Sequence, residues 1–209
     1  MSVAENPQEH WEGRYAEKPQ MWSGRVNAHV ATIAGELTPG RALDLGCGEG
    51  ADAIWLATNG WQVVAVDIAT NALDRARAAA EAGGVAERID FQHHDLSDSF
   101  PAGSFDLVSA QFLHSTVRLD RRQILKNAAA AVAVGGNLLI VDHGEPPPWA
   151  TKHIHDHYFQ SPQEVLSELG LPEDSWQPQH VGTLERDAVG PAGESAILRD
   201  NLIVLRRTH

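Results

Sequence analysis

Between residues 41 and 142, short apolar runs rich in β-branched residues alternate with alanine-rich stretches of helical character. This alternation is typical of a parallel β-sheet with helices packed on both of its faces. We expect interior strands at Arg41–Leu45, Gln62–Asp67, Ile89–His93, Phe105–Ala110 and Asn137–Asp142. The helices between them are expected at Gly50–Thr58, Ala69–Ala82 and Arg121–Val134, with the glycine pair Gly135-Gly136 ending the last one. The pattern predicts an α/β fold of the doubly wound type.

The pattern changes after Asp142, where a loop rich in proline and histidine begins. The sequence Ser161-Pro162-Gln163-Glu164 has the form of a capping box and predicts the start of a helix. Two strand-like runs follow, at Gln179–Glu185 and Asn201–Arg206, with a turn between them. Because neighbouring strands joined by a turn run antiparallel, we expect an antiparallel C-terminal edge on an otherwise parallel sheet.

The charge of the chain limits the partners that it can bind. The chain has 28 acidic and 16 basic residues, a net charge of −12, and no dense run of lysine or arginine. Since proteins that coat nucleic acids draw their affinity from clustered cations, we expect no nucleic-acid partner. The single cysteine excludes an internal disulfide, and neither a signal peptide nor an apolar run of about 18 residues is present. We therefore expect a cytoplasmic location and no membrane association.

A glycine-rich loop, Asp44-Leu45-Gly46-Cys47-Gly48-Glu49-Gly50, directly follows the first expected strand and directly precedes a helix. Open α/β sheets bind their ligands at this edge, and glycine lets the backbone approach a ligand closely. Asp67 ends the next strand, 19 residues after Gly48, where a carboxylate accepts hydrogen bonds from both hydroxyls of a ribose. The loop and the acid together predict a nucleoside-binding site.

The spacing of the glycines distinguishes among nucleotides. The loop reads G-x-G-x-G rather than G-x-G-x-x-G, and Glu49 within it is an unfavourable neighbour for a pyrophosphate. No Gly-Lys-Ser/Thr sequence follows, which excludes a P-loop. A dinucleotide is disfavoured, so a nicotinamide-dependent oxidoreductase is kept only as a less favoured alternative.

In these motifs the chain resembles the class I S-adenosylmethionine-dependent methyltransferases. The resemblance rests on Asp44–Gly50, Val66-Asp67-Ile68, His94-Asp95-Leu96 and the strand Phe105-Asp106-Leu107-Val108 that leads to Gln111. It implies a Rossmann-like sandwich, S-adenosylmethionine as the cofactor, and a single methyltransferase domain over residues 41–209.

The resemblance also implies which residues bind the cofactor. They are Asp44, Gly46, Gly48, Asp67, Ile68, Asp95, Leu96 and Gln111. By this likeness Asp44 anchors the loop, and Gln111 faces the methionine end of the cofactor and the substrate. Asp67 holds the ribose, Ile68 packs on the adenine, and Asp95 accepts a hydrogen bond from the adenine amino group.

Residues 1–40 precede the domain and are expected to form an aromatic leader over the cofactor site. His10-Trp11-Glu12-Gly13-Arg14-Tyr15 and Trp22-Ser23-Gly24 resemble the thiopurine and tellurite-resistance methyltransferases. That likeness implies that Tyr15 and Trp22 line the sulfonium pocket and that Arg14 pairs with a carboxylate. An aromatic face attracts a cation such as a sulfonium by roughly 0.5–2 kcal/mol. In the alternative interpretation, the aromatic side chains only attach the leader to the domain.

The chain contains eleven histidines, and several follow expected strands. His114 comes after the fourth strand at the ligand-binding edge, where it is a candidate catalytic base for an O–H or N–H acceptor. The alternative is a structural histidine at a helix start. The spacing His153-x-His155-x-His157 suits a metal site, but no supporting ligand motif accompanies it, so we expect no metal. His143, His153 and His157 are instead expected to contact the acceptor.

Two further positions have competing interpretations. Cys47 is expected to fill a small buried space in the loop rather than to act as a nucleophile. The pair Arg121-Arg122 either faces an acidic acceptor or is solvated at a helix start.

The sequence as a whole predicts an S-adenosylmethionine-dependent methyltransferase that transfers a methyl group in line to a small-molecule acceptor. Alignment of the two reactants accounts for most of the expected catalysis. Sulfur, selenium or tellurium is the favoured acceptor atom from the leader, with oxygen and nitrogen left open. The alternative is a non-catalytic S-adenosylmethionine-binding protein, and the sequence does not indicate an oligomeric state.

Overall fold

The structure is a computed structural model that describes residues 6–150, 158–190 and 192–209. Within these residues the strands form one sheet in the order β3-β2-β1-β4-β5-β7-β6. Strands β1 to β5 run parallel, whereas β7 is antiparallel to β5 and β6 is antiparallel to β7. The bounds are β1 Arg41–Leu45, β2 Gln62–Asp67, β3 Ile89–His93, β4 Phe105–Gln111, β5 Val132–His143, β6 Trp176–Val189 and β7 Ser195–Arg207. The predicted doubly wound sandwich with an antiparallel C-terminal edge is confirmed.

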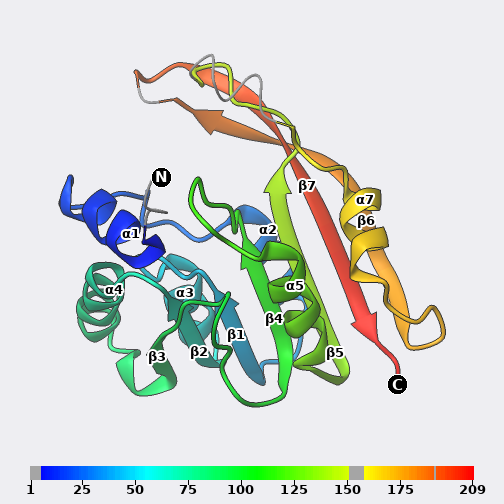
Figure 1. The fold of residues 1–209 in the computed structure, drawn as a ribbon. Helices are drawn as coiled ribbons and strands as arrows, with labels where there is room; N and C mark the ends of the chain where they lie inside the picture. Colours follow the sequence, from blue (N-terminus) through cyan, green and yellow to red (C-terminus); the bar gives the residue numbers. More distant parts are fainter. Residues whose placement is uncertain (1–5, 151–157, 191) are drawn as a thin grey trace.

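Helices cover both faces of the sheet (Figure 1). Helices α2, α3 and α4 contribute to one buried core and α5 and α7 to the other, so a strand such as β1 buries Ala42 on one side and Leu43 on the opposite side. The bounds are α1 Pro7–Ala16, α2 Ala28–Gly35, α3 Ala51–Thr58, α4 Thr70–Ala82, α5 Arg121–Ala130 and α7 Pro162–Leu169, with a 3₁₀ turn at Ala86–Arg88. None of the helices described is long and apolar enough to cross a membrane.

The end of α5 differs from the prediction. The helix stops at Ala130 instead of Val134, and β5 begins at Val132, which is fully buried and pairs with Phe105. The pair Gly135-Gly136 lies inside β5, where the register with β4 shifts. A Cβ atom on Gly136 would lie 2.9–3.0 Å from the carbonyl oxygens of Phe105 and Ala133. Gly136 therefore permits a close strand contact, and the glycine pair does not terminate the helix.

Strands β6 and β7 are much longer than the predicted runs. The pairing of β7 with β5 ends at His143 and Asp200, but the pairing of β6 with β7 continues to Val189 and Ser195. We call this outer part of the hairpin, residues 184–190 and 192–200, the arm. Figure 1 shows the arm extending past the carboxyl end of β5, on the side of the sheet where the ligand-binding loops lie.

Candidate active site

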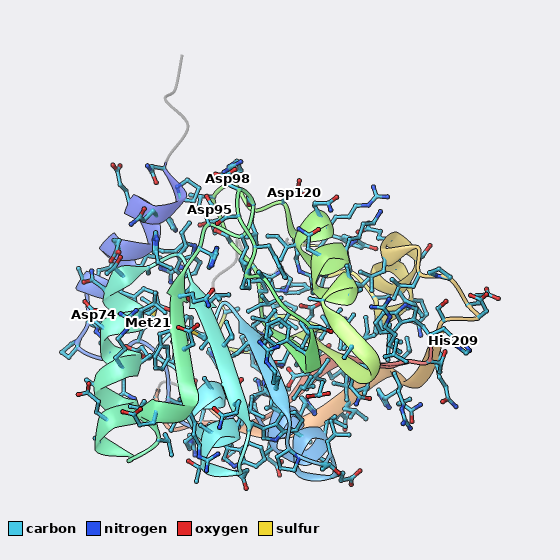
Figure 2. All side chains as sticks on the ribbon, turned by 90° about the horizontal axis from the view of Figure 1, so that it is seen from below. Met21, Asp74, Asp95, Asp98, Asp120 and His209 are labelled. Carbon is cyan, nitrogen blue, oxygen red and sulfur yellow. The ribbon has the colours of Figure 1, made fainter. Side chains whose placement is uncertain are left out.

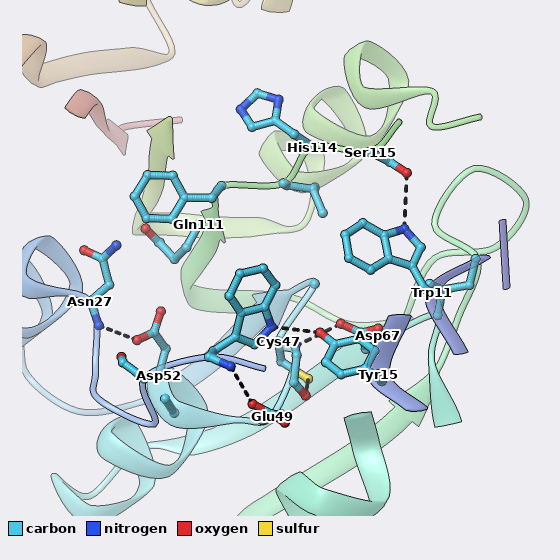
Figure 3. Close-up of a pocket in the computed structure, with 18 of the residues that line it drawn as sticks. Trp11, Tyr15, Asn27, Cys47, Glu49, Asp52, Asp67, Gln111, His114 and Ser115 are labelled. Atoms are coloured by element: carbon cyan, nitrogen blue, oxygen red, sulfur yellow. Dashed lines mark hydrogen bonds between the residues drawn. The ribbon is translucent and has the colours of Figure 1, made fainter. Parts of the chain in front are cut away.

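A cavity of about 690 Å³ opens at the carboxyl ends of β1, β2 and β4. The leader, the glycine loop, the start of α3, the loops after β2, β3 and β4, and the arm all contribute to its walls (Figure 3). The predicted site residues that line it are Tyr15, Trp22, Gly46, Gly48, Asp67, Ile68, Asp95, Leu96, Gln111 and His114. Two others do not: Asp44 is buried beneath the wall, and Arg14 is exposed with its guanidinium over the Trp11 ring, 5.2 Å from the centroid.

Asp67 connects the glycine loop to the end of β2. Its Oδ2 accepts a hydrogen bond from Gly48 N at 2.9 Å, and its Oδ1 accepts one from Ala69 N at 2.9 Å. Burial raises the pKa of Asp67, and the bonds from Ala69 and Gly48 partly offset this effect. Because each carboxylate oxygen has a second lone pair, Asp67 keeps acceptor capacity toward the cavity.

The leader is attached to the domain by hydrogen bonds at several points. Glu49 accepts from the backbone N–H groups of Met21, at 3.0 Å, and Trp22, at 2.9 Å, and it pairs with Arg75 at 2.8 Å. Trp11 Nε1 donates to Ser115 Oγ at 3.2 Å, across the mouth of the cavity (Figure 3). Glu49, which disfavours a pyrophosphate in this loop, therefore attaches the leader to the domain.

Glu12 supplies a second attachment of α1. Its two carboxylate oxygens accept from Thr70 N at 2.6 Å and Asn71 N at 3.1 Å, at the start of α4. The N-cap residue of α4, Ala69, offers no side-chain acceptor, so Glu12 satisfies N–H groups that would otherwise lack a partner. This bond places α1 against α4, and α1 in turn presents Tyr15 to the cavity.

The loops after β3 and β4 form the end of the cavity that contains Asp95. Asp95 Oδ1 accepts from Ser97 N at 2.9 Å, and its Oδ2 lies 3.2 Å from an Arg118 nitrogen, which also pairs with Asp98 at 2.6 Å. Asp120 N donates to Ser97 Oγ at 3.0 Å, so the two loops are joined. Figure 2 shows Asp95, Asp98 and Asp120 along the same edge of the molecule. Arg118 was not predicted as a site residue; its guanidinium holds the orientation of Asp95.

Gln111 ends β4, and its side chain faces the centre of the cavity (Figure 3). Its amide nitrogen and oxygen are both buried, and neither has a hydrogen-bond partner within the described residues. A buried amide with no partner costs free energy that a bound ligand would recover. The position therefore suits a ligand that offers both a donor and an acceptor.

Asp52 is a cavity residue that was not among the predicted site residues. It lies in the first turn of α3, and its Oδ1 accepts from Asn27 N at 2.6 Å. Burial raises its pKa to about 6. An acid in the first turn of the helix after a glycine loop is the sequence signal that would have indicated it.

His114 stands at the mouth of the cavity beside a buried carboxylate. Its Nε2 lies 3.0 Å from Oδ1 of Asp142, and the other oxygen of Asp142 pairs with Arg121, whose Nε also donates to Leu113 O at 3.1 Å. Burial would raise the pKa of Asp142, but the bond from His114 and the charge of Arg121 bring it below its ordinary value. Arg121 thus pairs with the buried carboxylate of Asp142. Neither predicted role, contact with an acidic acceptor or solvation at a helix start, included this pair.

The other histidines lie apart from this pair. His143 stacks on Phe112 with ring centroids 4.3 Å apart, and burial lowers its pKa, but it does not line the cavity. His153 and His157 lie outside the described residues. Among the residues that are described, no group of three or more metal-ligating side chains is found.

The arm supplies the part of the wall nearest α2. Arg186 and Asp187 line the cavity, and Arg186 pairs through Nε with Asp200, which is fully buried and lies 3.1 Å from His29 Nε2. The guanidinium of Arg186 is 6.0 Å from the Phe112 ring centroid. Sequence spacing gave no indication of this wall, because the arm follows the glycine loop by more than a hundred residues.

Cys47 is partly buried and packs against the core on the α3 side of the sheet. Burial raises the pKa of its thiol well above the ordinary value, which opposes formation of the reactive thiolate. These observations agree with a packing role in the loop.

Comparison with known proteins identifies the central part of the chain. Residues 42–136 match a family model described as a methyltransferase domain. The 27-O-demethylrifamycin SV methyltransferase of Amycolatopsis mediterranei is 35% identical over 105 residues, which is 49% of this chain and 38% of that protein. The tRNA 5-carboxymethoxyuridine methyltransferase of Escherichia coli is 34% identical over 105 residues, 48% of this chain and 39% of that protein. The chain thus spans about two fifths of the length of these relatives.

Solved structures share the fold over nearly the whole chain. One comes from work on conversion of a disulfide bond into a thioacetal group during echinomycin biosynthesis, with a TM-score of 0.71, 23% identity and coverage of 97% of this chain and 92% of that one. TehB from Haemophilus influenzae has a TM-score of 0.67 and 19% identity, over 93% of this chain and 66% of that one. The chain thus contains a methyltransferase domain at residues 42–136, and nearly the whole chain has the fold of these solved structures.

Proposed function

We propose that this protein binds S-adenosylmethionine in the described cavity and transfers its methyl group to a small-molecule acceptor. The observation that carries the proposal is the buried amide of Gln111, unpartnered within the described residues and placed between the glycine loop and the cavity mouth. The amino-acid end of the cofactor offers both an ammonium donor and a carboxylate acceptor, and an amide has a matching acceptor and donor. Bound S-adenosylmethionine supplies a methyl group on a positively charged sulfur.

The residues that line the cavity suggest how the cofactor is oriented in it. The remaining lone pairs of Asp67 would accept from the ribose hydroxyls, while Ile68 and Leu96 would contact the adenine. Asp95 stays a proposed acceptor for the adenine amino group, because Arg118 and Ser97 leave lone pairs on its oxygens. This arrangement directs the sulfonium toward Gln111 and the leader.

The aromatic residues of the leader would then lie beside the reacting centre. Tyr15 is 3% exposed, and its hydroxyl accepts from Trp22 Nε1 at 3.0 Å. Burial raises the pKa of Tyr15, so its hydroxyl stays protonated and does not act as a base. The proposed role of both rings is to exclude water and to stabilise the cation through their faces. Arg14 lies over the Trp11 ring and does not line the cavity, so its proposed contact with the cofactor has no support in the geometry.

His114 is the proposed base for an acceptor that must lose a proton. Asp142 and Arg121 hold the imidazole at the mouth, and the ionised Asp142 stabilises the protonated ring after it takes the acceptor proton. The acceptor lone pair attacks the methyl carbon, and the electron pair of the breaking carbon–sulfur bond stays on sulfur. An acceptor that is already a thiolate would need only alignment.

The charges around the cavity favour a small acceptor. The names of the relatives indicate different classes of acceptor: one is named for demethylrifamycin and another for tRNA. Here the chain has a net charge of −12, and two of the three arginines that line the cavity, Arg118 and Arg186, are already paired with Asp95 and Asp200, which leaves Arg25. A polyanion such as tRNA therefore finds little positive charge to bind. The cytoplasmic location and the position in the thiopurine and tellurite-resistance group stay predictions.

Two measurements test the proposal with the full chain. Addition of S-adenosylmethionine or S-adenosylhomocysteine should raise the melting temperature, whereas NADH should not. Release of S-adenosylhomocysteine should then be detected with members of a panel of small thiols, phenols and amines. Absence of cofactor binding would overturn the proposal as a whole. Binding without turnover of any panel member, but with methylation of tRNA, would overturn the small-molecule acceptor.

A further inference from the structure

A strained turn lies at the end of β4, between two residues of the site. Phe112 is the one residue other than glycine in the described part of the chain that has a positive φ, +49°. A bulky residue in this region costs free energy, and it persists where surrounding contacts hold it. Gln111, which faces the cavity, precedes Phe112, and His114 follows it by two positions (Figure 3). The strained residue therefore lies between a proposed cofactor contact and the proposed base.

The turn is held from the neighbouring strand β5. Phe112 N donates a hydrogen bond to Val141 O at 2.7 Å, and the Phe112 ring stacks on the ring of His143, with centroids 4.3 Å apart and planes 22° apart. His143 in turn meets Phe159 edge to face, with ring centroids 6.4 Å apart. His114 N donates to Phe112 O at 2.8 Å. The backbone bonds thus set the course of the turn, and the His143 ring restrains the side chain of the strained residue.

The turn positions the residues that follow it. Leu113 packs directly against the glycine loop, because a Cβ atom on Gly46 would lie 2.8 Å from Leu113 Cδ1. On the face of the sheet that α5 covers, His114 Nε2 lies 3.0 Å from Asp142 of β5. On the opposite face, the Phe112 ring packs against the core formed with α2 and α3. Two contacts between β4 and β5, one on each face, therefore fix the start of the loop that carries His114.

We propose, on the basis of the proposed function, that His143 is a positioning residue whose ring, stacked on Phe112, holds the strained turn that directs His114 toward the acceptor. His143 does not line the cavity, so it acts through Phe112 and not by contact with a ligand. Burial lowers the pKa of His143, so its ring is neutral at neutral pH and the stack depends on the plane of the ring rather than on charge.

Loss of the ring should affect the base more than the cofactor site. Without a stacked partner, Phe112 relaxes toward a negative φ and His114 moves relative to the acceptor. A displacement of about 1 Å costs up to a hundredfold in rate. Gln111 stays in place, because it lies within β4 and pairs in register with Val141. The expected result is a lower kcat with an unchanged affinity for S-adenosylhomocysteine.

Two substitutions of His143 separate the plane of the ring from its other properties. His143→Phe keeps a flat ring that stacks on Phe112 but has no nitrogen, and His143→Leu keeps apolar bulk without a plane. His180→Leu is the matched control, because His180 is half-buried on β6 and does not line the cavity. For phenol or amine acceptors that wild type methylates, we expect His143→Leu to lower kcat by about 10–100-fold at nearly unchanged KM. We expect a smaller loss with thiolate acceptors, and the wild-type kcat in the other two variants.

Hydrogen exchange reports on the turn without any turnover. The reporter is the amide of His114, which donates to Phe112 O. We expect it to exchange roughly twofold to tenfold faster in His143→Leu than in wild type, as one aromatic pair is lost. It should exchange at the wild-type rate in His143→Phe and His180→Leu.

The outcomes distinguish the positioning role from the proposed function. Equal exchange of the His114 amide in wild type and in a folded His143→Leu variant would overturn the hold on the turn. Equal losses of kcat in His143→Leu and His143→Phe would overturn the role of the stacked ring. Absence of cofactor binding or of any methylated acceptor would overturn the proposed function, whereas the exchange rates would still decide whether His143 holds the turn.

Discussion

The indole nitrogen of Trp22 donates a hydrogen bond to the hydroxyl of Tyr15 at 3.0 Å, and this pair of side chains closes over the glycine loop. A Cβ atom on Gly48 would lie 3.1 Å from Trp22 Nε1 and 3.1 Å from the Tyr15 hydroxyl. The backbone of Gly48 has a φ of +53°, which residues with a side chain rarely adopt. The absence of a side chain at Gly48 therefore lets the leader approach the loop.

Gly48→Ala should lower folding stability through backbone strain, and it should also displace the leader from the glycine loop. We expect a loss of about 1–2 kcal/mol of folding stability from the positive φ, and a further loss of cofactor affinity as Trp22 and Tyr15 are displaced. Gly84→Ala is the matched control, because Gly84 has a φ of +68° but a Cβ atom there would meet none of the described residues within 4 Å. The measurements are the melting temperature and the S-adenosylhomocysteine affinity of both variants. Equal losses in the Gly48 and Gly84 variants would contradict a contact between the new Cβ atom at residue 48 and the side chains of Trp22 and Tyr15.

Glu49 is expected to hold the leader in a pH-dependent manner. Burial would raise its pKa, but the N–H groups of Trp22 and Met21 and the charge of Arg75 lower it below 4.5. Because the folded pKa lies below the unfolded one, this stabilisation is fully present at neutral pH and is lost as the pH falls below about 4.5 through the folded value. Glu49→Gln should expose the leader at neutral pH.

The measurement is hydrogen exchange of the amides of Met21 and Trp22 in wild type and in Glu49→Gln. Glu17→Gln serves as the control, since Glu17 is exposed and lies on the leader outside the cavity wall. We expect faster exchange in the Glu49 variant and no change in the Glu17 variant. Equal protection in all three proteins would show that other contacts hold the leader.

The order of the central elements was predictable from the sequence because it depends on local pattern. Strands β1, β2 and β3 begin and end where the apolar runs do. Strands β1 and β2 are interior strands, apolar on both faces, as predicted. The prediction of β3 as an interior strand was wrong, because β3 lies at the edge of the sheet and most of its residues are only partly buried or exposed. The end of α5 was not predictable in this way, because a glycine pair serves equally as a helix stop or as a close strand contact. Only the packing of Gly136 against Phe105 distinguishes the two.

The site also combines features that the local sequence predicts with contacts that only the folded chain creates. The glycine loop and Asp67 were recognisable because the turn and the strand end are both local features. The partners of Glu49 and His114 were not, because Met21 lies 28 residues before Glu49 and Asp142 lies 28 residues after His114, and only the folded sheet brings them together. The length of the arm was underestimated for a related reason: its outer strands pair with each other and lack the buried faces that mark an interior strand.

The pair His114 and Asp142 should affect turnover without affecting cofactor binding. For phenol or amine acceptors found by the panel, His114→Gln should lower kcat by about 10²–10⁴-fold, the usual contribution of a general base. For thiol acceptors at a pH where they are ionised, the loss should be much smaller. S-adenosylhomocysteine affinity should stay unchanged, and an equal loss with both acceptor classes would assign His114 a positioning role.

Asp142→Asn separates support of the base from stability of the fold. Asp142 is 5% exposed and also pairs with Arg121, so its replacement leaves a partly buried guanidinium without its counter-charge. We expect this variant to lose folding stability, measured by urea unfolding, whereas His114→Gln keeps it. Unchanged unfolding of Asp142→Asn would show that the Arg121 pair contributes nothing to the fold.

Asp67 has two duties that a pair of ligands can separate. It holds Gly48 N and Ala69 N in the loop, and it is proposed to accept from the ribose hydroxyls. Asp67→Ala should remove the loop bonds and the proposed ribose contact and weaken cofactor binding sharply, but a distorted loop alone would give the same result.

A comparison of two ligands tests the ribose contact by itself. Asp67→Asn keeps one acceptor oxygen, and a preference for adenosine over 2′,3′-dideoxyadenosine reports on the hydroxyls alone. The control is Asp74→Asn, the same change of side chain on α4, where Asp74 pairs with Arg77 outside the cavity wall. We expect wild type and Asp74→Asn to show this preference and Asp67→Asn to lose most of it, roughly tenfold for a hydrogen bond to a charged group. Competition against S-adenosylhomocysteine measures all of these affinities, and a preference that survives in Asp67→Asn would place the ribose elsewhere in the cavity.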